Sequence, residues 1–431
     1  MKYYSLNHNS KPTLFQYAVK RGLAPDRGLY FPETITKLPN TFFEEIEDMS
    51  ITEMAYKVIK PYIGNQIKKE KLLEIIEETL DFDFPIIEIT ENIASLELFQ
   101  GPTLAFKDVG ARFMARCLGH FTENTNEKIT VLVATSGDTG GAVANGFYDV
   151  EGINVVILYP KGKVSDIQEK QLTTLGKNIT ALEVDGVFDD CQDMVKTAFL
   201  DATINEKIQL TSANSINVAR WLPQMFYFFI AYRKLKHLNK DLVFSIPSGN
   251  FGNICAGMMA QKMGLPIKHF IASTNVNDTV PSYLETGAYE PKPTIPTLSN
   301  AMDVSDPSNF IRIQKIFNND IFKLKKKLSG YRYTDSETKK ALKEIYEING
   351  YVADPHGAIG YMGLKEYFEN NEGDFYGVFL ETAHPVKFMD TVKKALKIDI
   401  EIPERLKETL TRDKMSIPIK DFSDLKEYLL R

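Results

Sequence analysis

Lys107 stands at the end of an apolar, loop-forming run, in the sequence GPTLAFKD at 101–108. The residues from Leu98 to Phe106 carry no charge, and Asp108 follows the lysine directly. An amine in an apolar, partly desolvated pocket has a lowered pKa and becomes a nucleophile. Lys107 is therefore a candidate for Schiff-base formation with an aldehyde cofactor. The simpler alternative is a lysine near a helix start whose amine reaches water.

Two loops rich in glycine and short polar side chains follow predicted strands. The first is ATSGDTGGA, residues 134–142, after the strand KITVLV, and the second is PSGNFGN, residues 247–253, after LVFSI. Such loops present backbone N–H groups at the start of a helix, where phosphate or carboxylate binds. One loop of this kind is also explained by a tight turn, but two in one chain favour anion binding. Neither matches GxxxxGK(S/T) or GxGxxG, which disfavours a P-loop NTPase and a Rossmann dinucleotide site.

Two further segments place polar residues at strand ends. The first is TSANSINVARW, residues 211–221, in which Asn217 and Arg220 lie three apart and could share a helical face. Arginine suits bidentate phosphate binding, although a helix cap and a surface arginine would explain the same residues. The second is LETAHP, residues 380–385, where Thr382 and His384 are equally explained by local capping and a structural histidine.

The elements that carry these loops are typical of an α/β protein. From Ile86 onward, short β-branched runs alternate with amphipathic runs, the pattern of βαβ units with buried parallel strands. The length suits two open, mostly parallel sheets, in which ligands sit beyond the carboxyl ends of the strands. Residues 1–84 differ, because helical stretches such as KEKLLEIIEETL dominate there. The sequence thus predicts two α/β domains and a largely helical N-terminal region.

Composition excludes several classes of function. The chain has 431 residues, a net charge of −6 and no long basic block, which disfavours nucleic acid as a partner. Its three cysteines, Cys117, Cys191 and Cys255, form no CxxC pair, so neither a metal site nor a disulfide framework is predicted. The polar N-terminus lacks the apolar core of a signal peptide, and the run MFYFFIAY is too short to span a bilayer. We expect a cytoplasmic protein without membrane contact.

Taken together and in order, the motifs resemble those of the threonine synthase family, pyridoxal-phosphate (PLP) enzymes of fold type II, the tryptophan synthase β group. The matching segments run from GLYFP at 28–32 to TAHP at 382–385, nearly the whole chain, and include GPTLAFKD, ATSGDTG, SANSIN, PSGNFGN, NVNDTVP and SNAMDVS. The resemblance implies a carbon–oxygen lyase that converts O-phospho-L-homoserine and water to L-threonine and phosphate. That reaction is a γ-elimination followed by β-hydration, the last step of threonine biosynthesis.

The resemblance also implies roles for individual residues. Lys107 would form the Schiff base with the cofactor and carry protons, and Thr382 would face the pyridine nitrogen. Asp138 stands where many fold type II relatives have an asparagine near the cofactor's 3′-oxygen. The cofactor phosphate would be held by Gly249, Asn250, Phe251, Gly252 and Asn253. The substrate would be bound through its carboxylate or phosphate by Ser136, Gly137 and Thr139, and through its phosphate by Ser215, Asn217 and Arg220.

Within that fold we predict three parts. They are an N-terminal region at 1–84, a larger cofactor-binding domain at 85–110 and 225–431, and a smaller mobile domain at 111–224 that closes over the substrate. The partner is a small molecule, and the chain is expected to be a monomer or a homodimer. Two alternatives stay open: another fold type II lyase such as a serine/threonine dehydratase, and a non-catalytic phosphate-ligand-binding protein. The dehydratase needs no site for a substrate phosphate, and the binding protein needs neither Lys107 nor Thr382.

Overall fold

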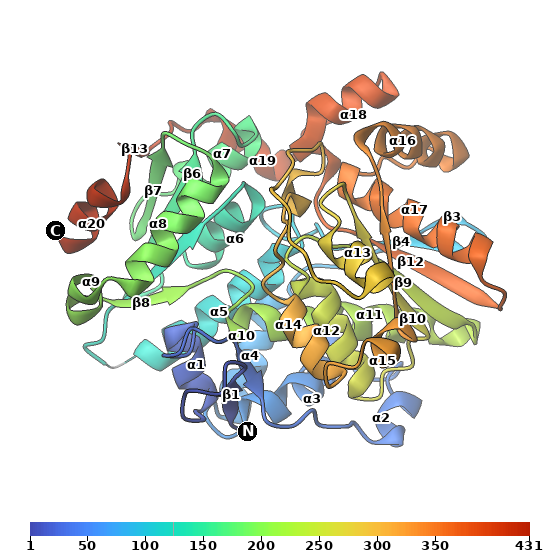
Figure 1. The fold of residues 1–431 in the computed structure, drawn as a ribbon, viewed down its shortest axis with the longest axis horizontal. Coiled ribbons are helices and arrows are strands. Elements are labelled where there is room, and N and C mark those ends of the chain that lie inside the picture. Colours follow the sequence, from blue (N-terminus) through green and yellow to red (C-terminus); the bar gives the residue numbers. More distant parts are fainter. Residues whose placement is uncertain (124) are drawn as a thin grey trace.

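The body of the molecule consists of a larger and a smaller α/β layer, each made of one sheet and the helices that cover it. N-terminal helices pack against both layers at the bottom of the view in Figure 1. The computed structural model describes residues 1–123 and 125–431. The predicted α/β fold, with two mostly parallel sheets and a largely helical N-terminal region, is confirmed. Among the described residues, none of the helices combines the length and the apolar character that crossing a bilayer requires.

The larger sheet has six strands in the order β11-β10-β9-β12-β4-β3. Neighbouring strands are parallel except β3 and β4, which pair antiparallel. Helix α17 packs against the face that carries Ser245 and Ser273, whereas α11 and α12 pack against the alternate residues Phe244 and Phe270. Cover on both faces explains why β10 and β12 are mostly apolar and are buried along their whole length. The strands are β3 (Ile86–Thr90), β4 (Ile93–Glu97), β9 (Asp241–Pro247), β10 (His269–Thr274), β11 (Leu328–Arg332) and β12 (Phe375–Glu381).

Most remaining helices surround this larger sheet or join it to the smaller one. Helix α5 is central, since it contacts the N-terminal helices, α6 of the smaller layer and α10. The α-helices are α5 (Lys107–Thr122), α10 (Val218–Trp221), α11 (Met225–Leu235), α12 (Gly252–Lys262), α13 (Thr279–Thr286), α14 (Phe310–Ile316), α15 (Ile321–Lys325), α16 (Asp335–Asn349), α17 (Pro355–Asn370), α18 (Met389–Leu396) and α19 (Glu404–Thr411). The short 3-10 turns are η1 (Leu222–Gln224), η2 (Lys236–Leu238), η3 (Asn300–Met302) and η4 (Pro385–Phe388).

The smaller sheet has five strands, all parallel, in the order β13-β7-β6-β5-β8. Its central strands are apolar, and β5 is buried at every position. Its strands and helices are β5 (Ile129–Ala134), α6 (Asp138–Gly146), β6 (Ile153–Pro160), α7 (Asp166–Thr173), β7 (Ile179–Val184), α8 (Phe188–Leu200), α9 (Ala202–Lys207), β8 (Gln209–Ser212), β13 (Ile417–Ile419) and α20 (Phe422–Leu430).

The C-terminal segment corrects one predicted boundary. We assigned 225–431 to the larger domain, but β13 pairs with β7 of the smaller sheet, with Ile419 opposite Val184. Helix α20 follows and buries Leu425 and Leu429 in the same apolar cluster as α8 (Figure 1). The cause is the exposed edge of β7, which a short apolar strand can cover wherever it lies in the sequence. The chain therefore returns to the smaller layer at its end.

The N-terminal region is helical except for one strand pair. Strands β1 (Tyr3–Ser5) and β2 (Tyr30–Pro32) pair antiparallel, and the Tyr3 hydroxyl donates to the Tyr62 carbonyl at 2.9 Å. Apolar residues of this region belong to the same core cluster as both sheets, so it is packed into the body. Its helices are α1 (Phe15–Arg21), α2 (Asn40–Glu44), α3 (Ile51–Ile63) and α4 (Lys69–Thr79).

Candidate active site

One cavity lies where strands of both sheets end. Ala134 ends β5, Pro247 ends β9 and Thr382 follows β12, and all three line this cavity. The placement agrees with the rule that ligands of open parallel sheets bind beyond the carboxyl ends of the strands. The predicted site residues that line the cavity are Lys107, Ser136, Asp138, Thr139, Ser215, Arg220, Gly249, Asn250, Phe251, Gly252, Asn253 and Thr382.

The backbone before Lys107 is hydrogen-bonded to the segment that follows β12. The Phe106 N–H donates to the Thr382 carbonyl at 2.8 Å, and the His384 N–H donates to the Leu104 carbonyl at 3.1 Å. Leu104 has a φ of 59°, a left-handed conformation that is uncommon for leucine and needs support from its surroundings. Lys107 is the first residue of α5, so these hydrogen bonds fix the position of its backbone next to Thr382.

Asp108 and Tyr227 hold the same loop from the opposite side. The Asp108 carboxylate accepts from the Thr103 N–H at 2.9 Å and from the Thr103 hydroxyl at 2.5 Å. The Tyr227 hydroxyl donates to the Phe106 carbonyl. Burial is the main influence on both groups and raises the pKa of Asp108 and of Tyr227. These side chains position Lys107 without facing the cavity.

The Lys107 side chain is half-buried, and desolvation of its amine lowers its pKa. The Asp138 carboxylate opposes this effect and raises the pKa, whereas the cations Lys387 and Arg220 lower it further. A lowered pKa leaves a larger fraction of the amine neutral near pH 7 than an exposed lysine has. The neutral amine is the form that acts as a nucleophile or a base.

The loop at 249–253 offers N–H groups to the cavity. In the described part of the chain, no protein acceptor is hydrogen-bonded to the backbone N–H groups of these five residues. Gly249 lies so close to the next loop that an added Cβ would stand 2.6 Å from the Ala301 carbonyl oxygen. The Asn253 amide donates to the Pro247 carbonyl at 2.9 Å, so this side chain shapes the loop. Free N–H groups at the start of α12 form a cradle for an anion.

The loop before α6 is similar but is organised by Thr135. The Thr135 hydroxyl accepts from the Gly137 N–H at 3.0 Å and from the Gly140 N–H at 2.8 Å. Gly137 has a φ of 141°, and an added Cβ would stand 2.4 Å from Gln168 Cδ. Gly137 is absent from the cavity wall, so its predicted contact with the substrate is not supported.

Arg220 is a buried guanidinium with two unsatisfied nitrogens. Its side chain lines the cavity, the residue is 4% exposed, and Nε and Nη1 have no hydrogen-bond partner among the described residues. Nε also lies 3.5 Å from the place of a Cβ on Gly110, one turn after Lys107. Burial lowers the pKa of Arg220 to about 10, so the group stays charged at neutral pH. A buried charge without a partner is costly, which makes these nitrogens the clearest sign of an anionic ligand.

Asn217 does not reach the cavity, contrary to prediction. Its side-chain oxygen caps α10 by accepting from the Ala219 N–H at 3.0 Å. Its amide donates to the Val19 carbonyl at 2.9 Å and to the Ser212 carbonyl at 3.1 Å. Because these bonds use both ends of the amide, Asn217 has a structural role, and as the cap it lies outside the helical face that carries Arg220.

Ser215 lies where two loops meet. A Cβ on Gly252 would stand 3.1 Å from Ser215 Cβ, so the serine adjoins the 249–253 cradle. The Asn309 amide donates to the Ser215 hydroxyl at 2.9 Å, and the Arg312 guanidinium donates to the Ser215 carbonyl at 3.0 Å. Both anchors belong to the segment around α14, so the predicted substrate residue is fixed to the larger layer.

A buried hydrogen-bond chain stands behind Thr382. The Ala383 N–H donates to the Asp354 carboxylate at 3.3 Å, and that carboxylate lies 2.5 Å from His356 Nδ1. His356 Nε2 in turn accepts from the Ala301 N–H at 3.3 Å, which places the ring proton on Nδ1. The chain connects the segment of Thr382 to the segment that contacts Gly249, and so fixes two walls of the cavity together.

Several lining residues were not predicted to contact a ligand, although Phe106, Thr135 and Asn214 lie within the motifs quoted from the sequence. The family motif SNAMDVS was a signal for 300–304, but it suggested no contact with a ligand. The unpredicted lining residues include Phe106, Gly110, Thr135, Gln168, Phe188, Asn214, Gln224, Asn300, Ala301, Met302, Asp303, Val304 and His356.

The cavity fits PLP on three observations. A half-buried lysine with a lowered pKa, a cradle of free N–H groups and the Thr382 hydroxyl all meet there. Such groups can form a Schiff base, hold a phosphate and contact a pyridine ring. The fold and the cavity define a PLP-dependent enzyme, and the family described as "Pyridoxal-phosphate dependent enzyme" matches residues 91–374.

Two further family matches cover the ends of the chain. "Threonine synthase N terminus" matches residues 2–80, and "Threonine synthase, C-terminal" matches residues 357–429. The chain is 44% identical to a threonine synthase of Buchnera aphidicola subsp. Acyrthosiphon pisum, covering 100% of both proteins. It is 42% identical to a threonine synthase of Escherichia coli K12, covering 100% of this chain and 99% of that protein. The chain belongs to the threonine synthase family, and the resemblance seen in the sequence is confirmed.

Solved structures agree with this assignment. The crystal structure of threonine synthase from Escherichia coli matches with a TM-score of 0.94 at 41% identity, covering 100% of this chain and 99% of that one. A PLP-bound threonine synthase from Brucella melitensis matches with a TM-score of 0.92 at 34% identity, covering 100% and 98%. A threonine deaminase from Solanum lycopersicum reaches 0.56 at 15% identity over 77% of this chain, which shows a shared fold alone. PLP is therefore the cofactor, as predicted.

Proposed function

We propose that this chain converts O-phospho-L-homoserine and water to L-threonine and inorganic phosphate. The proposal is carried by two sets of anion donors in one cavity: the N–H groups of 249–253, and Nε and Nη1 of buried Arg220. A PLP enzyme with a phosphorylated substrate must hold two phosphates, one of the cofactor and one of the substrate. A serine/threonine dehydratase must hold one, and would leave the Arg220 charge buried without a partner.

Three groups would hold the cofactor. When bound, PLP supplies an aldehyde that condenses with an amine and a ring that delocalises charge developing at the substrate α-carbon. Lys107 Nζ is the amine, and the 249–253 loop holds the phosphate through its N–H groups. The Thr382 hydroxyl, which lines the cavity, would contact the ring nitrogen and, being neutral, would not need to protonate it.

Lys107 would also move the protons of the reaction. Its Nζ would take the proton from the substrate α-carbon and pass it back to the conjugated system of substrate and cofactor, which frees the amine to take a second proton from the β-carbon; phosphate then leaves Cγ. A proton returns to Cγ, water adds at Cβ, and a proton returns to Cα. The lowered pKa of Lys107 suits this work, because a larger fraction of the amine is neutral near pH 7 than in an exposed lysine.

The substrate's two anionic groups would bind at different walls. Arg220 Nε and Nη1 donate to the phosphate and stabilise it as charge develops on the leaving oxygen, with Ser215 beside it. Ser136 and Thr139, at the start of α6, receive the carboxylate. Closing of the smaller layer over these groups excludes bulk water, which would otherwise protonate the wrong carbon.

A spectrum and a phosphate-release assay test the proposal. Purified protein should show the visible absorbance of bound PLP, and should release phosphate from O-phospho-L-homoserine with L-threonine as the organic product. L-threonine given alone as substrate should not be consumed. Deamination of threonine without phosphate release from phosphohomoserine would establish the dehydratase instead. Absorbance with neither reaction would indicate a non-catalytic binding protein.

The assembly state and location belong to the same proposal. We infer a monomer or a homodimer, which sedimentation of the PLP-bound protein decides. A cytoplasmic location stays a prediction, and fractionation of cells that express the chain tests it.

A further inference from the structure

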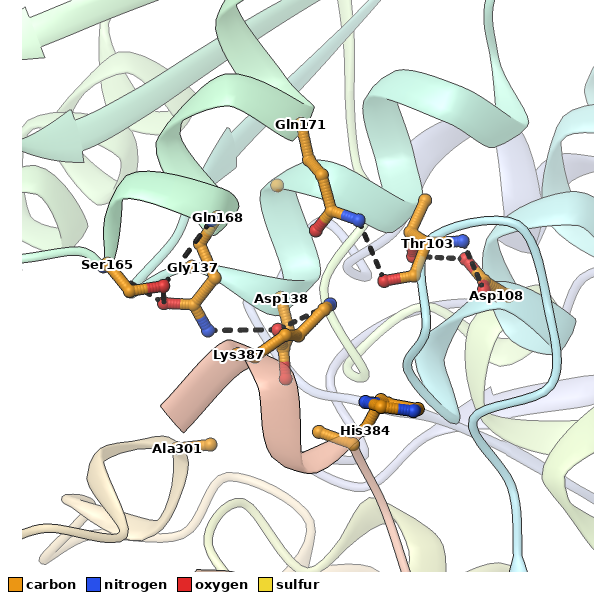
Figure 2. A network of polar contacts seen from close by, with 12 residues as sticks. Thr103, Asp108, Gly137, Asp138, Ser165, Gln168, Gln171, Ala301, His384 and Lys387 are labelled. Atoms are coloured by element: carbon orange, nitrogen blue, oxygen red, sulfur yellow. Dashed lines mark hydrogen bonds and ion pairs between the residues drawn. The ribbon is translucent and has the colours of Figure 1, made fainter. Parts of the chain in front are cut away.

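A fully buried lysine lies beside the cavity, and the reaction outlined above gives it no task. Lys387 belongs to η4, five residues after Thr382, and its side chain is 0% exposed. Its Nζ donates to Asp138 Oδ1 at 2.8 Å, as Figure 2 shows. Lys387 is not part of the cavity wall, whereas Asp138 is. The lysine can therefore influence the cavity only through the groups it touches and through its charge.

Two donors from different segments bind the same carboxylate oxygen of Asp138. Gln168 Nε2 donates to Asp138 Oδ1 at 2.9 Å, so the amide and the ammonium meet at the same atom (Figure 2). Among the described residues, no hydrogen bond uses the other oxygen, Oδ2. With Oδ1 fixed on the side of Lys387 and Gln168, Oδ2 is the oxygen free to meet a ligand in the cavity.

The orientation of Gln168 is itself fixed. Gln168 Oε1 accepts from the Ser165 N–H at 3.2 Å in the capping box of α7, which turns Nε2 toward Asp138. The side chain passes over Gly137 at a distance that a Cβ would not permit. The absence of a side chain at 137 is thus explained by this contact, which is a different reason from the predicted one.

The Asp138–Lys387 pair joins the two layers. Asp138 begins α6 and Gln168 lies in α7, both of the smaller layer, whereas η4 follows β12 of the larger sheet. The pair spans 249 positions of the chain. Its formation therefore requires the two layers to be in the arrangement that builds the cavity.

The charges around Lys107 give the pair a chemical consequence. Burial alone would raise the pKa of Asp138, but Lys387 and then Lys107 outweigh it and lower that pKa to about 2. Burial lowers the pKa of Lys107; Asp138 then raises it, Lys387 and Arg220 lower it, and Asp354 raises it. Lys387 and Asp138 therefore act on the Lys107 nitrogen in opposite directions.

We propose that Lys387 is a positioning residue: its ammonium holds Asp138 Oδ1, turns Oδ2 of that carboxylate toward the cavity, and partly offsets the charge of the carboxylate at the Lys107 nitrogen. The inference rests on the proposed function for the role of Lys107. It differs from that function in assigning work to a lysine that touches neither substrate nor cofactor. The experiment can contradict the role of Lys387 while the proposed reaction remains valid. The proposed reaction can likewise be wrong while the role of Lys387 remains valid.

The experiment is a pH titration of the absorbance of PLP-bound protein, which reports the protonation of the Lys107 nitrogen. Lys387→Met removes a cation and should move the midpoint to higher pH, whereas Asp138→Asn should move it to lower pH. Lys387→Gln keeps a hydrogen-bond donor without charge and should follow Lys387→Met in direction. The control is Lys394→Met, an exposed lysine of α18, which should keep the wild-type midpoint.

Turnover adds a second readout through a double-mutant cycle. Lys387→Met should reduce kcat at least tenfold with PLP still bound, and the Lys387→Met/Asp138→Asn double variant should be no slower than Asp138→Asn alone. Wild-type midpoints in Lys387→Met and Lys387→Gln, or fully multiplicative losses in the cycle, would overturn the proposal. If Lys387→Met does not fold, the midpoint of Lys387→Gln decides. Failure of wild-type protein to release phosphate would overturn the proposed function and leave the absorbance test intact.

Discussion

At the scale of single residues, Arg220 is the strongest evidence for an anionic ligand. A guanidinium that is 4% exposed, with Nε and Nη1 unpaired among the described residues, is unfavourable until an anion arrives. Hydrogen bonds to charged groups contribute about 1.5–3 kcal/mol each, which corresponds to roughly ten- to a hundredfold in binding. The 4% exposure of Arg220 also excludes the alternative interpretation of this residue as a surface arginine.

We predict that Arg220→Met lowers kcat/KM for O-phospho-L-homoserine by at least about a hundredfold, because the substrate phosphate loses its charged donors. Steady-state phosphate release measures the effect. The absorbance of bound PLP serves as the internal control and should be unchanged. Loss of PLP from this variant with unaltered turnover of the remaining holoenzyme would contradict the assignment of Arg220 to the substrate.

Lys107 has a different test, since it serves both the cofactor and the protons. We predict that Lys107→Ala abolishes phosphate release and removes the Schiff-base absorbance, because no other amine lines the cavity in the described part of the chain. A full-wavelength spectrum and a phosphate assay on the same preparation give both readouts. Retained activity would show that a different group carries the reaction.

At the scale of elements, β10 and β11 are joined by a buried histidine. His269 Nε2 lies 2.9 Å from the Ser329 hydroxyl, and its ring stacks on Tyr367 with centroids 4.8 Å apart. Burial, reinforced by Lys327, lowers the pKa of His269 to about 4. The unfolded chain binds a proton at this histidine near pH 6.5, whereas the folded protein does not until about pH 4. The stability from this group is therefore complete above pH 6.5 and lost as the pH falls toward 4.

We predict that the free energy of unfolding falls between pH 6.5 and 4, by on the order of 2–3 kcal/mol from His269. His269→Gln should flatten this part of the profile, which urea unfolding at several pH values measures. His237→Gln replaces an exposed histidine and should leave the slope as in the wild type. Equal slopes in wild type and His269→Gln would show that other groups cause the loss.

The C-terminal helix offers a second test at this scale. Leu425 is 0% exposed and packs in the cluster shared by α8, α20 and the smaller sheet. Leu425→Ala should reduce the free energy of unfolding by about 2–5 kcal/mol, the range for a buried leucine. Met415→Ala, at a residue 51% exposed just before β13, is the control and should change stability by well under 1 kcal/mol. A similar effect for both variants would mean that α20 is not packed as described.

At the scale of the whole molecule, the sequence predicted the architecture better than the connections within it. Buried parallel strands have a continuous apolar sequence, so β5, β9 and β12 were visible locally, and the loops after them led to the cavity. The sequence did not show which side chains hydrogen-bond to the backbone of a loop and so shape it. Asn217 and Arg220 have similar local signals, and only their partners in space show that the first is a cap and the second faces the cavity.

Contacts distant in sequence explain the other errors. Lys387 reaches Asp138 across 249 positions, and β13 covers an edge strand that ends more than two hundred residues earlier. No window of sequence contains both partners of either contact. A lysine in the apolar run PVKFM resembles Lys107 in LAFKD, and that similarity was the one local signal for a further lysine near the cavity.

The two layers also predict a change of shape on binding. Residues of both layers line the cavity. A ligand that contacts Ser136 and Arg220 together therefore favours closer approach of the two layers. We predict that O-phospho-L-homoserine lowers the radius of gyration of PLP-bound Lys107→Ala or of the wild type during turnover, as measured by small-angle X-ray scattering. The outcome against this prediction is an unchanged curve at saturating substrate.

The return of the C-terminus to the smaller sheet bears on how the protein is made. During synthesis the strands 129–212 emerge from the ribosome long before residues 417–430. Until then, β7 has an unpaired edge and the apolar side of α8 has no cover. The nascent chain must pass through a period in which this half-built layer is open to association with other chains, and messages truncated near their 3′ end would yield protein fixed in that exposed form.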